Sequence, residues 1–286
     1  MRVLVTGAAG QLGQDVVAAF EASPSRHQVV ALDHAGLDVG DRDAVLQAVD
    51  AVGPDVVIHG AAWTAVDACE TDPDRAFAVN ALGTRHVAEG ARLSGAHVVY
   101  ISTDYVFDGR AHDPYVEWDH PNPLSVYGRS KLGGEREVQS LVPGATVVRT
   151  SWVCGAHGAN MVKTILRLSS QHRELAFVDD QRGCPTFTED LAAMIVRLSG
   201  GRLPGLFHVT NQGPTTWYDF ARDVVKAAGL DPSMVRPIAT HDLDPPRPAP
   251  RPANSVLDNA ALRLQGIPLL ADHHEPLERV VRQLRS

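Results

Sequence analysis

Two patterns of apolar positions alternate along the first half of the chain. Short runs rich in β-branched residues predict buried strands at 2–6, 28–32, 54–59, 97–101 and 145–150. Helical spacing of apolar residues predicts helices at 14–20, 41–52 and 76–93, and helix-forming residues resume at Ser125. This alternation predicts an α/β fold with a doubly wound parallel sheet of the Rossmann type and right-handed crossovers.

The alternation weakens beyond residue 150, which indicates a second, smaller unit. Apolar spacing there predicts helices at 160–169, 188–198 and 217–228 and strands at 175–178 and 206–209, before a proline-rich polar loop at 242–252. We expect a dinucleotide-binding domain over 1–150, with a return segment near 175–198. We expect a smaller carboxyl-terminal α/β substrate domain formed mainly by 151–174 and 199–286.

A glycine-rich loop follows the first strand. Gly7, Gly10 and Gly13 have the spacing G-x-x-G-x-x-G between a strand and a helix, where backbone N–H groups can face a pyrophosphate. Asp33 ends the second strand about 20 residues further on, where a carboxylate accepts hydrogen bonds from an adenosine ribose. No arginine or lysine directly follows Asp33, so NADH is at least as well supported as NADPH. Asp38-Val39 lies where the chain would return to the adenine.

A tyrosine and a lysine lie one helical turn apart at Tyr127 and Lys131. A fixed positive charge near a phenol lowers the phenol pKa toward a catalytically useful range. Thr103 adds a hydroxyl at the carboxyl end of a parallel strand, which is where open α/β sheets bind ligands. The three side chains together predict a site for proton transfer beside a dinucleotide.

Composition narrows the class of protein. The 286 residues are 44% hydrophobic and carry a net charge of −8, which argues against nucleic acid and anionic membranes as partners. The sequence has no apolar run of about 20 residues, and the stretch before Gly7 is too short for a signal peptide. Three cysteines in scattered positions suit unpaired thiols in a reducing cytoplasm. The histidines show no zinc-type spacing, and we expect His273-His274 on a solvated surface.

With the glycine loop, Thr103, Tyr127 and Lys131 in place, the sequence resembles an extended short-chain dehydrogenase/reductase. Within that superfamily it resembles the dTDP-4-dehydrorhamnose reductase family. The segments that carry this resemblance are 10–13, 64–67, 102–109, 126–131, 149–153, 183–186 and 251–255. They run through nearly the whole chain.

The resemblance implies a reaction and its catalytic residues. The C4 ketone of dTDP-4-dehydro-β-L-rhamnose would be reduced to dTDP-β-L-rhamnose with hydride from NADH or NADPH. Tyr127 would donate the proton, and Thr103 would hydrogen-bond the ketone oxygen. Lys131 would lower the Tyr127 pKa and hold the nicotinamide ribose.

The resemblance also implies binding residues. Asp104 and Trp152 match positions that contact the sugar. Arg251 suits a diphosphate or sugar, although a solvated loop arginine is an equal alternative. The cofactor positions that it carries over are Gly7, Gly10, Gln11, Leu12, Gly13, Asp33, Asp38, Val39, Ala62, Trp63, Thr64, Tyr127 and Lys131.

Two departures from the family pattern concern packing and metal. His59-Gly60-Ala61-Ala62 stands where the family usually has Asn-Ala-Ala-Ala, and we expect it to alter packing under the cofactor. Some relatives bind Mg²⁺ between subunits through acidic residues. Asp15 and Glu189 fall near two such positions, but Asp15 is shorter than the family's glutamate and a third ligand is not evident. We therefore predict no metal, and a monomer or homodimer.

Three alternative functions remain open. A dehydratase or epimerase of the same fold is disfavoured because Thr103-Asp104-Tyr105 lacks the glutamate that elimination needs. A reductase of another dTDP-4-keto-deoxyhexose, such as one that forms dihydrostreptose, is not well separated by these motifs. A non-catalytic regulatory subunit is disfavoured because Thr103, Tyr127 and Lys131 are all retained.

Overall fold

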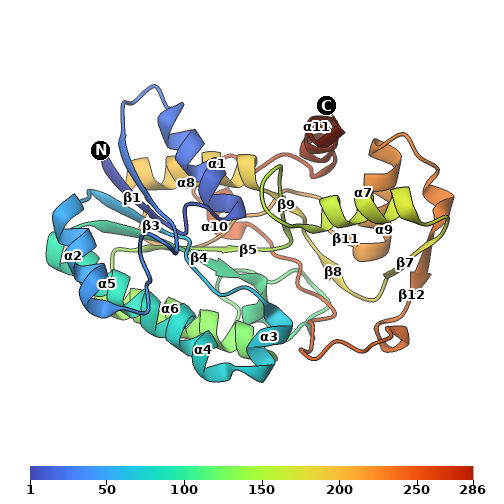
Figure 1. Ribbon diagram of the computed structural model, residues 1–286, viewed down its shortest axis with the longest axis horizontal. Helices are drawn as coiled ribbons and strands as arrows, with labels where there is room; N and C mark the ends of the chain where they lie inside the picture. The colour runs from blue at the N-terminus through green and yellow to red at the C-terminus, as the bar shows by residue number, and fades with distance from the viewer. Residues whose placement is uncertain (286) are drawn as a thin grey trace.

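A parallel six-stranded sheet forms the centre of the larger lobe. The computed structural model describes residues 1–285. The strand order is β10-β5-β4-β3-β1-β2, and every neighbouring pair is parallel (Figure 1). Its strands are β1 (Arg2–Thr6), β2 (Gln28–Leu32), β3 (Val56–His59), β4 (His97–Thr103), β5 (Thr146–Thr150) and β10 (Gly205–His208).

Helices cover both faces of this sheet, so the lobe has three layers. One face carries α1 (Gln11–Glu21), α8 (Thr188–Gly201) and α10 (Ala260–Leu264), and the other carries α2 (Arg42–Val52), α5 (Gly83–Ser94) and α6 (Val126–Leu141). Strand side chains alternate between two cores. Val5 packs with Phe20 and Ile195, whereas Leu4 packs with Val49. The doubly wound sheet that the sequence predicts is confirmed.

The smaller lobe packs helices against a two-stranded sheet. Its main elements are α7 (Met161–Gln171), β7 (Leu175–Val178), α9 (Trp217–Ala227), β12 (Val235–Ile238) and α11 (His274–Arg285). Two short strand pairs join β6 (Val153–Cys154) to β9 (Thr186–Phe187) and β8 (Arg182–Gly183) to β11 (Thr215–Thr216). The remaining helices are α3 (Val66–Thr71), α4 (Pro73–Phe77), a π-helix at Ala78–Leu82 and 3₁₀ turns at Asp104–Val106, Pro232–Met234 and Thr240–Asp242.

The topology corrects the expected division of the chain. β10 joins the large sheet beside β5, although the sequence pattern places 199–286 mainly in the substrate domain. β7 pairs with β12 in the smaller lobe, although the pattern places it in the return segment. Of that segment, only α8 belongs to the larger lobe, because its apolar side chains pack against α1. Four-residue strands carry no local signal of which sheet they join.

A buried ion pair fixes α6 against the sheet. Arg149 in β5 donates from Nε and Nη2 to the two carboxylate oxygens of Glu135 in α6, at 2.8 and 2.7 Å. Ser102 in β4 donates to the same carboxylate at 2.6 Å. Both charged side chains are 3% exposed. Two strands and a helix therefore meet at one carboxylate.

The three cysteines Cys69, Cys154 and Cys184 are all buried and unpaired, as the sequence predicts. Burial raises the pKa of each thiol above its usual value. These thiols therefore stay protonated and pack as small apolar groups. Over the described residues, every helix is too short or too polar to cross a membrane.

We predict that Arg149→Met lowers the free energy of unfolding by about 3–5 kcal/mol, because it leaves the Glu135 carboxylate buried without a partner. Arg85→Met is the matched control, since Arg85 forms an exposed ion pair with Glu137, also on α6. The control loses about 0–1 kcal/mol. Urea titration measures both, and equal losses would contradict the role of the buried pair.

Candidate active site

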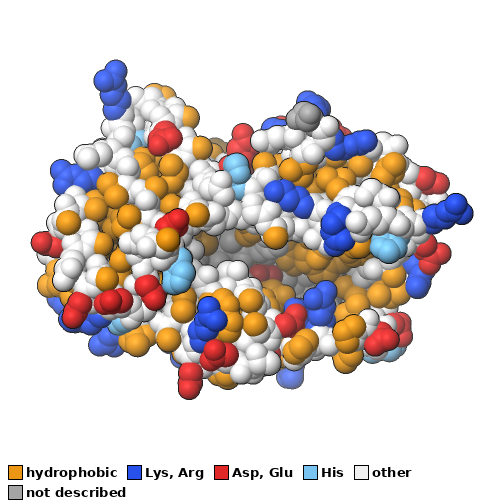
Figure 2. Space-filling view, viewed as in Figure 1, with side chains coloured by type: hydrophobic (Ala, Val, Ile, Leu, Met, Phe, Trp, Pro, Cys, Tyr) orange, Lys and Arg blue, Asp and Glu red, His pale blue; other side chains and the backbone are white. Residues whose placement is uncertain are grey.

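A pocket of about 550 Å³ lies at the carboxyl ends of the central strands and reaches the smaller lobe. Figure 2 shows the molecule hollowed between the two lobes. Among the residues predicted from sequence, those that line this pocket are Gly7, Gly10, Gln11, Leu12, Gly13, Ala62, Thr64, Thr103, Asp104, Tyr127, Lys131 and Trp152. Segments far apart in sequence therefore meet at one cavity.

The glycine loop has no room for side chains. Gly7 has φ +71°, and a Cβ there would lie 2.7 Å from the backbone nitrogen of Ala61. A Cβ on Gly13 would lie 2.3 Å from the Gly7 carbonyl oxygen. Gly10 caps α1, so the first N–H groups of that helix border the pocket. A chain built this way admits a pyrophosphate against bare backbone, which fits a dinucleotide.

Four predicted cofactor residues lie outside the lining of this pocket. Asp33 follows β2 and accepts a hydrogen bond from the Gly36 N–H at 2.9 Å. Asp38 accepts from the Gly40 N–H at 2.9 Å. Val39 is buried in the core beside α5. The Arg75 guanidinium carbon lies over Trp63, 4.6 Å from the centroid of the Trp63 ring. Their assignments to the cofactor stay predictions.

Tyr127 and Lys131 lie in the first turns of α6, whose amino terminus is capped by Ser125. The Lys131 ammonium donates to the Ile101 carbonyl oxygen at 2.7 Å and lies 4.2 Å from the centroid of the Tyr100 ring. Burial lowers the pKa of Lys131 to about 7, and the nearby Glu135 opposes that shift.

The Tyr127 pKa moves opposite to our expectation. Burial raises the pKa of this phenol, while the Thr103 hydroxyl opposes the shift and Asp104 adds to it. Lys131 is directed at Ile101 on β4, so its charge does not produce the expected lowering. The phenol therefore holds its proton firmly at neutral pH.

Asp104 is a buried carboxyl group beside Thr103. The Thr103 hydroxyl donates to its Oδ1 at 3.0 Å, whereas its Oδ2 is buried without a hydrogen-bond partner. Burial raises the pKa of Asp104 to about 6. Asp104 lines the pocket, so this carboxyl group is positioned to hydrogen-bond a ligand hydroxyl.

Sequence reasoning missed the residues that position Tyr127. A Cβ on Gly128 would lie 2.1 Å from the Tyr105 carbonyl oxygen, so only glycine lets α6 approach the end of β4 this closely. Asn80, in the π-helix, donates to Ser130 on α6 at 2.9 Å and to the Trp63 carbonyl oxygen at 3.0 Å. Asn80 thereby joins α6 to the loop after β3. Glycine directly after Tyr127 is the only sequence signal for this arrangement.

Trp152 and Trp217 form the wall of the pocket on the smaller lobe. Their rings stack with centroids 3.5 Å apart, and Trp152 has φ +46°. A Cβ on Gly183 would lie 2.4 Å from the Trp152 ring, so the indole fits against bare backbone. The sequence pattern indicates Trp217, at the start of α9, only as part of a helix. The stacked pair offers a flat apolar face to a ligand.

Arg251 is held by a carboxylate that sequence reasoning did not foresee. Its Nη1 and Nη2 donate to the two carboxylate oxygens of Asp67 at 2.6 and 2.8 Å. This partner lowers the pKa of Asp67 to about 2. Arg251 lines a neighbouring hollow with Tyr105 and Trp217 instead of the main pocket. It is therefore neither a solvated arginine nor, in this structure, free for a diphosphate.

His59 packs beneath the pocket. Its Nδ1 lies 2.8 Å from the Thr6 hydroxyl and its Nε2 lies 3.1 Å from the Thr84 hydroxyl. Burial lowers the pKa of His59 to about 3, so the ring is neutral. It bridges β1, β3 and α5 without lining the cavity.

The two acidic positions considered for Mg²⁺ have basic partners. Asp15 lies 3.6 Å from His157 Nε2, and Glu189 accepts from Arg279 Nε at 2.8 Å. The Arg279 Nη2 also donates to Asp190 at 2.6 Å. The guanidinium thus bridges both carboxylates at the start of α8.

One pocket on a doubly wound sheet combines a glycine loop with Thr103, Tyr127 and Lys131. This combination defines the class of extended short-chain dehydrogenases/reductases. The family model described as RmlD substrate binding domain matches residues 1–286, and the chain belongs to that family.

Individual relatives are similar to this chain over most of its length. The chain is 44% identical over 282 residues to a probable dTDP-4,6-dihydroxy-2-methyloxan-3-one 4-ketoreductase of Streptomyces antibioticus, covering 97% of this chain and 93% of that one. It is 42% identical to a dTDP-4-dehydrorhamnose reductase of Streptomyces griseus, over 93% and 88% of the two chains. A Bacillus anthracis dTDP-4-dehydrorhamnose reductase solved in complex with NADP superposes with TM-score 0.94 at 39% identity, covering 99% of both chains.

We predict that Gly128→Ala lowers kcat/KM for ketone reduction by roughly 100-fold, because the first turn of α6 must move away from Tyr105. Gly200→Ala on α8 is the control, since nothing lies within 4 Å of its added Cβ. Steady-state kinetics of both variants test the prediction. Wild-type kinetics in the Gly128 variant would contradict it.

We also predict a pH dependence of stability that belongs to Asp104. The folded protein keeps a proton on this carboxyl group that the unfolded chain releases, so raising the pH favours unfolding. The stability of wild type relative to Asp104→Asn therefore falls as the pH rises from 3.8, the ordinary pKa of an aspartate, to about 6. The loss amounts to about 3 kcal/mol at most. Urea titrations of both proteins from pH ~4 to ~7 measure this difference. A constant difference would contradict the raised pKa.

Proposed function

We propose that this chain reduces the C4 ketone of dTDP-4-dehydro-β-L-rhamnose to dTDP-β-L-rhamnose with hydride from NADH or NADPH. The observation that carries the proposal is one continuous pocket with the glycine loop at one end and Thr103, Tyr127 and Trp152 at the other. The family supports it, because relatives at about 40% identity are named as reductases of dTDP-4-keto sugars. The unpaired cysteines support a cytoplasmic location.

Tyr127 donates the proton that completes the reduction. Because burial raises the pKa of this phenol, its proton leaves only when the ketone oxygen develops the negative charge of an alkoxide. Thr103 lies beside it at the end of β4, and its hydroxyl donates to the same oxygen when it turns away from Asp104 Oδ1. The two hydroxyls therefore fix the orientation of the ketone.

The glycine loop and Lys131 hold the cofactor. The bare backbone of Gly7, Gly10 and Gly13 accommodates the pyrophosphate, and the bound dinucleotide supplies the hydride. Lys131 borders the pocket one turn beyond Tyr127, where its ammonium can donate to ribose hydroxyls.

Asp104 and the stacked tryptophans hold the sugar nucleotide. The unpaired Asp104 Oδ2 accepts from a sugar hydroxyl, and the face of Trp152 packs against an apolar face of the ligand. The Arg251–Asp67 pair borders the adjoining hollow, so a diphosphate there would compete with Asp67 for the guanidinium. The deoxysugar and nucleotide thereby lie on the smaller lobe.

A second substrate is favoured by a specific observation, namely the 44% identity to the Streptomyces antibioticus 4-ketoreductase. Under this alternative the same site reduces another dTDP-4-keto-deoxyhexose, of the dihydrostreptose type among others. Identification of the product by NMR after incubation with dTDP-4-dehydro-β-L-rhamnose separates the two. Any product other than the rhamnosyl nucleotide supports the alternative.

We predict that Tyr127→Phe lowers kcat by at least about 100-fold while NADPH still binds, because only the proton donor is removed. Tyr218→Phe is the control, since Tyr218 packs against Arg222 on α9, outside the pocket. Cofactor oxidation measures kcat and fluorescence titration measures NADPH affinity. Full turnover in Tyr127→Phe would refute the assigned role.

A further inference from the structure

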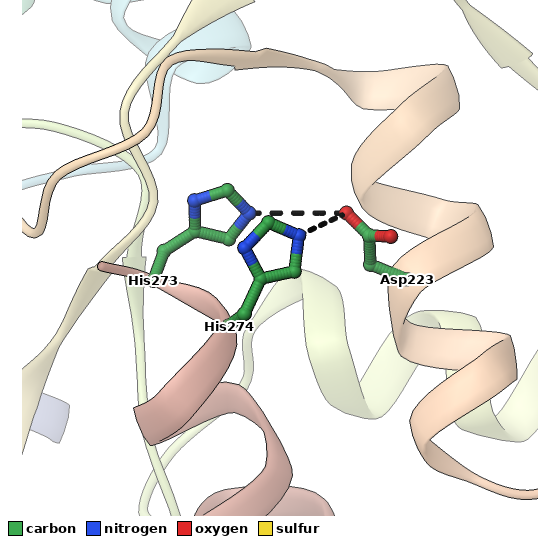
Figure 3. Close-up of side chains that lie close together, drawn as sticks. All are labelled: Asp223, His273 and His274. Atoms are coloured by element: carbon green, nitrogen blue, oxygen red, sulfur yellow. Dashed lines mark ion pairs between the residues drawn. The ribbon is translucent and has the colours of Figure 1, made fainter.

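Two histidines and an aspartate converge in the smaller lobe, away from the pocket. His274 is the first residue of α11, His273 precedes it, and Asp223 lies on α9. Figure 3 shows both imidazole rings facing the Asp223 carboxylate. Among the described residues, one ligand atom from each of these three lies within 4.8 Å of the other two. We expected His273-His274 to be solvated, but His273 is only 2% exposed.

Hydrogen bonds orient both rings toward Asp223. His273 Nδ1 lies 3.2 Å from the Gln212 carbonyl oxygen, and His274 Nδ1 lies 2.6 Å from Asp272 Oδ1. Carbonyl and carboxylate oxygens only accept, so each Nδ1 carries a hydrogen and each ring directs its Nε2 toward Asp223. A histidine whose Nδ1–H is held by a carbonyl or carboxylate is the usual arrangement of a metal ligand.

The two Nε2 atoms face the carboxylate of Asp223. The His273 and His274 Nε2 atoms lie 3.8 and 3.3 Å from Asp223 Oδ2. His273 Nε2 is buried and has no hydrogen-bond partner. Either a metal ion or a proton on an imidazole offsets the carboxylate charge at this spacing.

We propose that Asp223, His273 and His274 bind a first-row divalent cation, with Zn²⁺ as the best fit. Zn²⁺ binds nitrogen and carboxylate ligands at ~2.0–2.1 Å in tetrahedral geometry, which places ligand atoms roughly 3.3 Å apart. The His274–Asp223 separation already has this value. Two imidazoles disfavour Mg²⁺ and Ca²⁺, which take oxygen ligands. The surface hollow beside His274 leaves the fourth position to water.

The site would hold α11 against α9. Asp223 lies on the helix that begins with Trp217, the tryptophan that stacks on Trp152 in the pocket wall. Lys226 and Arg282 line the same surface hollow as Glu278, so charges of both signs surround the site. The three ligands therefore determine which metal binds, and the surrounding charged side chains do not. The inference stands independently of the proposed function.

The test uses the full chain without a histidine tag, stripped with EDTA and dialysed against Zn²⁺. We expect about one Zn²⁺ per chain by mass spectrometry, a raised melting temperature and no such response to Mg²⁺. His274→Ala and Asp223→Asn weaken binding by at least about tenfold, and the two side chains are 58% and 28% exposed. His241→Ala is the matched control, since His241 forms an exposed pair with Asp242.

The outcomes separate a metal site from a protonated histidine pair. Stoichiometric Zn²⁺ binding that both variants lose and the control keeps supports the proposal. Absence of stoichiometric binding, or equal binding by all four proteins, overturns it.

Discussion

The buried pair between Glu135 and Arg149 is the interaction on which the site depends. It joins α6 to β5, and Ser102 of β4 donates to the same carboxylate. α6 carries Tyr127 and Lys131, and β4 ends in Thr103, so the pair sets where these side chains stand relative to one another. Because both charges are buried, the pair must remain complete, which fixes the helix in one position.

Close backbone approaches extend this constraint to the rest of the pocket. Glycine at 7 brings the first loop against the loop after β3, and glycine at 13 brings α1 against the first loop. Glycine at 128 brings α6 against the end of β4. Gln11 reaches across to the second lobe, where its side chain donates to the Val153 carbonyl oxygen at 3.0 Å. Trp152 lies two residues beyond β5 and stacks on Trp217. The glycine loop and the stacked tryptophans are thus connected through one set of contacts.

Local sequence predicted the features that depend on local chemistry. The glycine loop, the strand ends and the Ser125 start of α6 are set by neighbouring residues, and all were predicted within a few positions. The Asp67–Arg251 pair, the burial of His273 and the placement of β10 depend on contacts between residues far apart in sequence. The direction of the Tyr127 pKa was wrong for the same reason. Helical spacing placed Lys131 one turn from Tyr127 but could not show that burial raises the phenol pKa or that the ammonium is directed at Ile101.

Isotope transfer tests the central claim most directly, that this pocket delivers hydride to the C4 ketone of a dTDP-sugar. The measurement incubates the protein with dTDP-4-dehydro-β-L-rhamnose and NADPH or NADH deuterated at the nicotinamide C4, then locates the label by NMR. The account predicts deuterium at C4 of the dTDP-β-L-rhamnose formed. A sugar product without deuterium, or with deuterium at any other carbon, would contradict it.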